Sequence, residues 1–136
     1  MRNHFTILLF LLAVNFYAFS QADFYALSQE GVRDKIDSLI KILPALKDAE
    51  RIDCLSELSD AYLAFSIDTA KIYADRVLTE SEKISYIKGK AKAYKNLGRV
   101  TFLLGKDLVA ADKYFDMSLE LFLKNGNEWQ EEKAVS

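Results

Sequence analysis

Few residues of this chain have the types and spacing that catalysis requires. The single cysteine, Cys54, would need to ionise to act as a nucleophile, yet its neighbours Asp53 and Leu55 supply no cation to lower the thiol pKa. The single histidine, His4, lies within residues 1–20, which have the features of a signal peptide. Removal of that segment excludes Ser–His–Asp triads, Cys–His pairs and histidine-containing zinc sites. We therefore predict a structural thiol at Cys54, no metal site, no cofactor and no enzymatic activity.

The acidic residues are more typical of a solvated surface than of a catalytic centre. Asp112 and Asp116 are four residues apart and would share a helix face, but Lys113 lies between them. An enzyme based on carboxylates alone remains a remote alternative. The net charge of −2 and the absence of a basic domain argue against nucleic-acid binding.

The composition favours one small helical domain. The chain has 136 residues, of which 51% are hydrophobic and 28% charged, with one proline and five glycines. These proportions are those of a globular protein, and the scarcity of proline and glycine favours helix over sheet. We predict an all-α fold.

Two copies of one pattern lie within the predicted helices. Leu58 and Leu97 are 39 residues apart, as are the small residues Ser59 and Gly98 that follow them. Small residues are needed where two helices cross closely, and large ones fill the groove between them. The predicted repeat-packing residues are Leu55, Leu58, Ser59, Tyr62, Ala70, Tyr94, Leu97, Gly98, Ala110 and Tyr114. A competing register puts Ala111 and Phe115 in place of the last two.

The pattern resembles the tetratricopeptide repeat (TPR), W-x2-L-G-x2-Y…A-x3-F…P, in a variant with a period of about 40 residues instead of about 34. The resemblance covers roughly residues 49–126. Thr101 stands where the motif has an aromatic residue, and no proline ends either copy. The resemblance implies a TPR-like right-handed solenoid of helix–turn–helix repeats, whose usual function is to bind other proteins.

A row of cations follows one face of the predicted helix in the second copy, at Lys88, Lys92, Lys95 and Arg99. In TPR proteins the first helix of each repeat lines a concave groove. By that resemblance, a bound peptide would contact Lys92, Lys95, Arg99 and Phe102. One hypothesis is therefore a cationic groove that accepts an acidic segment or a terminal carboxylate.

The alternative is that these cations pair within the protein. Alignment of the copies by 39 residues puts Asp53 opposite Lys92 and Asp60 opposite Arg99. Neighbouring helices would then join these residues in ion pairs, and the row would be an internal ladder or a solvated face. The sequence leaves both alternatives open.

Residues 1–20 are predicted to be a signal peptide. Residues 5–19 are apolar except for Thr6 and Asn15, and this run is short for a membrane span of about 20 residues. Cleavage is expected before Gln21 or, as second choice, before Asp23, and it changes the net charge from −2 to −3 because it removes Arg2. The mature protein would be periplasmic or secreted, with no further membrane span, or membrane-tethered if the segment is not cleaved.

The remaining chain divides into four predicted parts. Residues 21–48 are a lead-in with a helix that Pro44 ends, and residues 49–86 are the first repeat, with Ser66 or Asp68 as an N-cap. The lead-in helix would pack through Val32, Ile36, Leu39, Ile40 and Leu43. Residues 87–126 are the second repeat, whose last helix ends at residues 124–127, and residues 127–136 begin an incomplete third. We expect a fragment of a longer protein, or an open end that another copy closes.

The predicted function is a non-catalytic, exported module that binds a protein or peptide, and the cationic-groove hypothesis makes that partner acidic. The alternative is a sensor region. A signal segment, a helical lead-in and TPR-like repeats of 40 residues resemble the extracytoplasmic part of bacterial sensor histidine kinases and related regulators. Those proteins add a transmembrane helix and an output domain, neither of which occurs in residues 21–136.

Overall fold

The structure, a computed structural model, describes residues 26 and 28–135, with side chains up to residue 126. The chain forms two units, Met1–Lys35 and Ile36–Ser136. In the first unit the described residues, 26 and 28–35, are helical. The predicted signal peptide and both predicted cleavage sites lie outside the described residues. Within the described part, no helix combines the length and apolarity that crossing a membrane requires.

The second unit begins with helical residues 36–42 and the short 3-10 helix η1, Leu43–Ala45, which has Pro44 in its first turn. The prediction that Pro44 ends the preceding helix is thus confirmed. Ile36 and Leu39 are buried, whereas Ile40 is 43% exposed. The prediction that Ile40 shares the packing face was therefore wrong.

Four longer helices follow: α2 (Asp48–Tyr62), α3 (Ile67–Lys83), α4 (Ile87–Leu104) and α5 (Leu108–Val135). Ser66 is the N-cap of α3, because its Oγ accepts a hydrogen bond from the Thr69 amide at 3.2 Å. Gly105 ends α4 in the left-handed region, with φ of 63°. The helix end predicted at residues 124–127 was wrong, because α5 continues through them.

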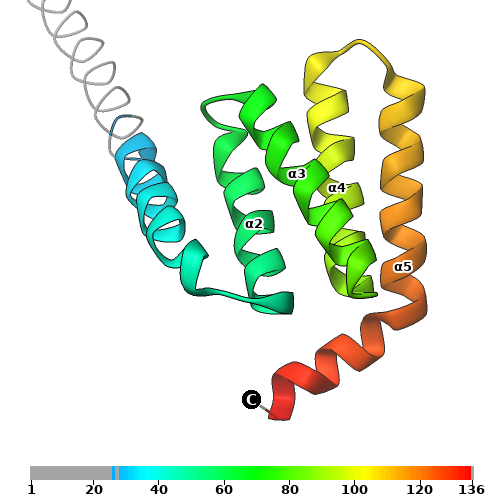
Figure 1. The fold of residues 1–136 in the computed structure, drawn as a ribbon. Coiled ribbons are helices and arrows are strands. Elements are labelled where there is room, and N and C mark those ends of the chain that lie inside the picture. The colour runs from blue at the N-terminus through cyan, green and yellow to red at the C-terminus, as the bar shows by residue number, and fades with distance from the viewer. Residues whose placement is uncertain (1–25, 27, 136) are drawn as a thin grey trace, which may run out of the picture. The chain divides into compact units, whose positions relative to one another are not determined.

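Figure 1 shows α2 to α5 side by side in a row, each antiparallel to the next, with α2 and α5 at opposite ends. Each helix packs against its successor, and α2 also contacts α4. The described residues contain helices and no strands, which confirms the all-α prediction.

The core lies between neighbouring helices. Ile52 and Leu55 of α2 pack with Val77 of α3 and Ala93 of α4. A second cluster joins Ala74 of α3 to α4, and three partly buried residues extend it. The α4 members are Tyr94 and Leu97, and the extending residues are Leu78, Tyr114 and Leu121.

The structure also decides between the two registers of the second copy. α2 and α4 begin 39 residues apart, but α3 and α5 begin 41 residues apart, at Ile67 and Leu108. Ala111 is therefore the counterpart of Ala70, and both are buried, whereas Ala110 is only half-buried. The assignment of Ala110 to the packing position was wrong, because α4 has 18 residues and α2 has 15. The connection after α4 is one residue shorter than the one after α2, so α5 begins two residues later than the 39-residue period predicts.

The other predicted repeat-packing residues do contribute to the interfaces. Ser59 Oγ donates a hydrogen bond to the Ala70 carbonyl at 2.9 Å. Tyr62 stacks on Tyr73, and Tyr114 stacks on Tyr94. The buried members are Leu55, Leu58, Ser59, Ala70, Tyr94, Leu97 and Gly98.

Candidate functional site

The cations of α4 lie beside α2, where they meet carboxylates. Lys92 Nζ donates a hydrogen bond to Asp53 Oδ1 at 2.8 Å, and the Tyr86 hydroxyl donates to the same carboxylate at 3.1 Å. Two turns along, Lys95 Nζ is 3.4 Å from Asp60 Oδ2. Arg99 Nη1 also donates to Asp60. The internal pairing predicted from the 39-residue alignment is therefore present.

We call these five residues, Asp53, Asp60, Lys92, Lys95 and Arg99, the charge ladder. Three cations meet two carboxylates, so the ladder keeps one positive charge in excess. The three cationic side chains are 28%, 41% and 45% exposed, in sequence order. The pairing lowers the charge that an anionic ligand would meet, but the cations stay accessible to one.

Phe102, the fourth residue of the predicted groove, belongs to an apolar surface. It is 58% exposed and lines two adjoining pockets, of about 430 and 310 Å³. Leu108, Val109 and Phe115 line the larger pocket with it, and Arg99 lines the smaller one. The structure therefore brings Arg99 and Phe102 together, whereas Lys92 and Lys95 lie further back along α4.

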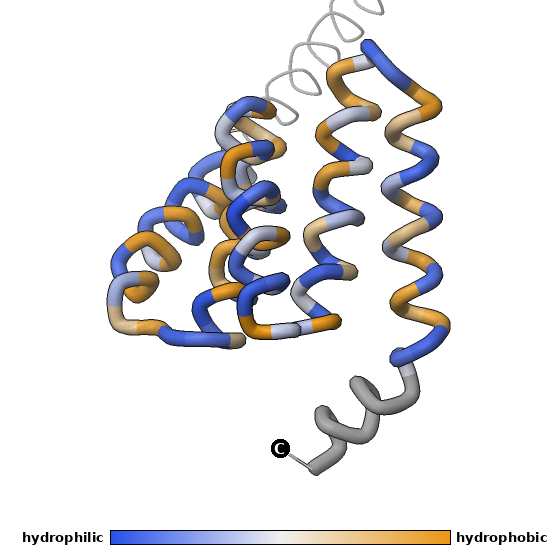
Figure 2. Tube along the Cα trace, turned by 45° about the vertical axis from the view of Figure 1, so that its right-hand side comes forward, coloured by the Kyte–Doolittle hydropathy of each residue, from blue (hydrophilic) through white to orange (hydrophobic). Residues whose placement is uncertain are grey.

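This surface continues along α5. Leu119 follows Phe115 by one helical turn and is 55% exposed. Figure 2 shows hydrophobic and hydrophilic stretches alternating along α5, as an amphipathic helix requires. We call the surface formed by Phe102, Leu108, Val109, Phe115 and Leu119 the open face.

Most residues of the open face were not predicted from the sequence to bind a ligand. Only Phe102 was predicted to contact a ligand. The available signal was the density of large apolar residues around the connection between α4 and α5, at positions 102–104 and 108–109. These residues belong to the ends of α4 and α5 that flank the connection. Several large apolar residues gathered at exposed helix ends indicate contact with another surface.

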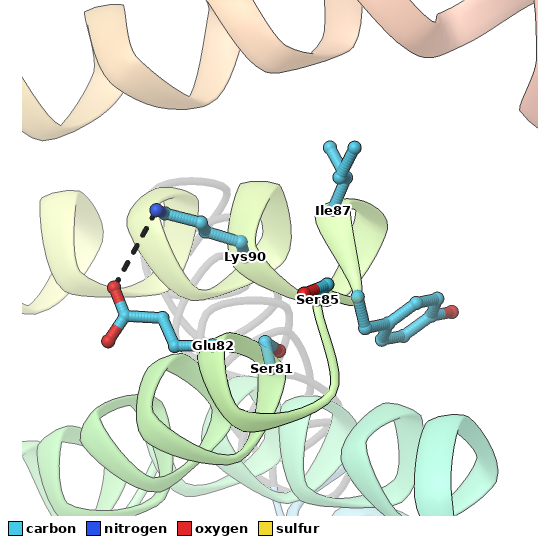
Figure 3. Close-up of a pocket in the computed structure, with 6 residues that line it drawn as sticks. Ser81, Glu82, Ser85, Ile87 and Lys90 are labelled. Carbon is cyan, nitrogen blue, oxygen red and sulfur yellow. Dashed lines mark ion pairs between the residues drawn. The ribbon is translucent and has the colours of Figure 1, made fainter.

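A separate pocket of about 290 Å³ lies where α3 meets α4 (Figure 3). Figure 3 shows Glu82 and Lys90 forming an ion pair across its rim, with 3.6 Å between Oε1 and Nζ. Ser81 Oγ is buried and has no hydrogen-bond partner among the described residues. The pocket is at the small end of the ligand-binding range, and its charges neutralise each other. A Cβ added at Gly89 would lie only 2.3 Å from Ser81 Oγ, so this serine belongs to the close crossing of α3 and α4.

Cys54 has the surroundings of a structural thiol. It is buried, and its Sγ donates a hydrogen bond to the Leu39 carbonyl at 3.6 Å. Burial raises the pKa of the Cys54 thiol, the nearby Glu57 raises it further, and Arg51 lowers it by less. The thiol is therefore protonated near neutral pH, whereas a nucleophilic cysteine reacts as the thiolate.

The remaining candidates for chemistry also lie apart. Asp112 and Asp116 are both exposed, as predicted for a solvated surface. Within the described residues, no three potential metal-ligating side chains come together.

Comparison of the chain with protein-family models, with curated proteins and with solved structures finds no significant match. The TPR resemblance therefore remains a prediction from the sequence pattern.

Proposed function

We propose that this protein is a non-catalytic binding module, built from two TPR-like helical hairpins, that binds a partner protein through the open face. The observation that carries the proposal is the exposure of five neighbouring large apolar residues on α4 and α5. Their exposed fractions range from 36% for Phe115 to 79% for Val109. Contiguous apolar surface of this kind is unfavourable in water and is typical of protein interaction sites.

The repetition within the chain supports the proposal. Helical hairpins of a solenoid bury their apolar sides against one another, so a hairpin without a neighbour on one side keeps apolar surface exposed there. α5 is the last helix of the row, and the open face lies on it and on the end of α4. Binding of a partner there would remove the exposed apolar surface from water.

The proposal includes export through the predicted signal peptide, residues 1–20. Expression in a bacterium and N-terminal sequencing of the product would test it. A mature chain that begins at Gln21 or Asp23 supports export, and one that retains residues 1–20 in the cytoplasm contradicts it.

Selection from a display library of 20-residue helix-forming peptides tests the binding function. We expect peptides whose binding to the protein is lost on Leu119→Asp or Phe102→Asp, because a charge on the open face disrupts apolar contacts. The matched control is Ile72→Asp, since Ile72 on α3 is 60% exposed and lies outside the open face. The control variant should bind as the unchanged protein does.

Two outcomes would overturn the proposal. The selection would yield no peptide that binds above background, or the selected peptides would bind Leu119→Asp and Phe102→Asp as tightly as the unchanged protein. Circular dichroism of each variant shows whether the helical fold is retained.

A further inference from the structure

We infer that the partner of the open face is an amphipathic helix that carries two acidic residues seven positions apart and lies along α4. The inference rests on the proposed function and specifies the partner's chemistry. It follows from the way in which α4 itself covers the first hairpin.

The first hairpin shows what covers such a surface in this molecule. α4 packs across α2 and α3, and the α3 residues that meet it are buried or partly buried. Ala74 is fully buried there, and Leu78 packs against the cluster that contains Tyr94 and Leu97. Their counterparts on α5, 41 residues later, are Phe115 and Leu119, which are 36% and 55% exposed. A helix placed against α4 and α5 as α4 is placed against α2 and α3 would cover these two residues.

The charge ladder indicates the sign of the charges on that helix. Lys92 of α4 occupies the same repeat position as Asp53 of α2, and Arg99 the same position as Asp60. Each of these two pairs is an ion pair, because the charge at this position is negative on α2 and positive on α4. A further helix that packs against α4 as α4 packs against α2 would place its own residues at these two repeat positions beside Lys92 and Arg99. Acidic residues there would continue the alternation, and basic residues would be repelled.

The cations of α4 have the capacity for a second partner. A lysine ammonium has three donors and an arginine guanidinium has five, and all three cations remain partly exposed. The excess of one positive charge in the ladder favours an approaching acid over a base. Seven residues are about two turns of a helix, so both acids would lie on one side of the partner.

Three synthetic peptides of residues 86–105, the sequence of α4 with its flanking residues, test the inference. The first is unchanged, the second carries Lys92→Asp and Arg99→Asp, and the third carries Lys90→Asp and Lys95→Asp. The last two have the same net charge, but only in the second are the acids seven positions apart on one side. A side-chain staple keeps their helicity equal, as circular dichroism verifies.

We expect the second peptide to bind the full chain about tenfold more tightly than either of the others, in a titration followed by fluorescence anisotropy. This peptide should not displace α4 from its place against α2, because its two aspartates would then be repelled by Asp53 and Asp60. The binding should weaken as salt is raised from 50 to 500 mM, since half-exposed ion pairs are screened. Leu119→Asp in the protein should abolish it, and Ile72→Asp should leave it unchanged.

The outcomes separate this inference from the proposed function. Equal binding of all three peptides, lost on Leu119→Asp, overturns the acidic partner and leaves the open face as a binding surface. No binding of the second peptide also overturns the inference, and the display selection then decides on the function by itself. Binding that Leu119→Asp does not weaken overturns both.

Discussion

The two helical hairpins of this protein follow one pattern but have different surroundings. α2 and α3 form the first hairpin and α4 covers one side of it, whereas the corresponding side of the second hairpin, α4 and α5, forms the open face. Leu78 packs into a core cluster, and its counterpart Leu119 is 55% exposed. The same residue type at the same repeat position is therefore core or surface according to whether a further helix lies against it.

The side chains at the crossing positions differ as well. On the covered side, Ser81 and Ala74 are small and fully buried. At the corresponding position to Ala74 the second hairpin has Phe115, whose ring lies against Gly98. Small residues let α4 approach α3 closely, whereas at the end of the row an aromatic ring packs against the glycine of α4.

The largest expected effect tests whether both hairpins belong to one core. Leu58 and Leu97 occupy the same position of the two copies and are 0% and 3% exposed. Leu58→Ala and Leu97→Ala should each lower the free energy of unfolding by about 2–5 kcal/mol, because each leaves a cavity. Urea denaturation measures both, with Ile72→Ala as the exposed control expected within about 0.5 kcal/mol. A much smaller loss for Leu97→Ala would show that the second hairpin contributes little to the cooperative fold.

The next effect contrasts the two helix crossings. A Cβ at Gly89 would lie 2.3 Å from Ser81 Oγ and 2.8 Å from Ile52, which is buried and cannot move aside. Gly89→Ala should therefore cost about 1–3 kcal/mol despite the higher helix propensity of alanine. A Cβ at Gly98 meets the ring of Phe115 at 2.8 Å, but that ring is 36% exposed and can rotate outward.

Gly98→Ala should therefore leave the free energy of unfolding nearly unchanged, because the gain in helix propensity of about 1 kcal/mol offsets the cost of displacing the ring. Thermal and urea unfolding of the two variants make the comparison. Equal losses for both would show that the Phe115 ring cannot move aside, just as the buried Ile52 cannot. Gly31→Ala, where no atom lies within 4 Å, gives the effect of propensity alone.

A smaller effect separates the covered leucine from the exposed one. Leu78→Ala should lower the free energy of unfolding by about 1–2 kcal/mol, because its side chain packs against the second core cluster. Leu119→Ala should change it by less than about 0.5 kcal/mol, as is usual for an exposed position. Addition of the peptide of residues 86–105 that carries Lys92→Asp and Arg99→Asp should enlarge the effect of Leu119→Ala, since the peptide would bury that side chain. A large loss without any peptide would show that another part of the chain already covers the open face.

Much of the fold could be predicted from local signals. Pro44 ends a helix because it lacks an amide hydrogen. Ser66 begins a helix because its hydroxyl accepts a hydrogen bond from the Thr69 amide. The extent of α5 could not be predicted from such signals. Lys124 forms an ion pair with Glu120 one turn earlier, and the Asn125 side chain donates a hydrogen bond to the Leu121 carbonyl at 2.9 Å. The residues that were expected to end the helix therefore interact with its preceding turn.

The candidate site was only partly predictable for a related reason. Alignment of the copies predicted which acids stand opposite which cations, but the choice between ladder and groove depended on the contact between α2 and α4. The open face was missed because Phe115 and Leu119 have the spacing of a core-facing stripe. Periodicity identifies the apolar side of a helix, and only the packing of the neighbouring helices shows whether that side is covered.

The smallest expected effect tests the ladder from which the partner's charges are inferred. A double-mutant cycle with Asp60→Asn and Arg99→Met should give a coupling energy of about 0.2–1 kcal/mol, because both side chains are partly exposed. The coupling should decrease in 0.5 M salt. The cycle separates the coupling of Asp60 with Arg99 from the contact of Lys95 with the same carboxylate. The control is the exposed ion pair of Lys71 and Asp75, which lies within α3. Zero coupling at low salt would mean that Asp60 and Arg99 do not attract each other in solution. The expectation of an acidic partner would then lose its basis, whereas the proposal for the apolar open face would keep its own.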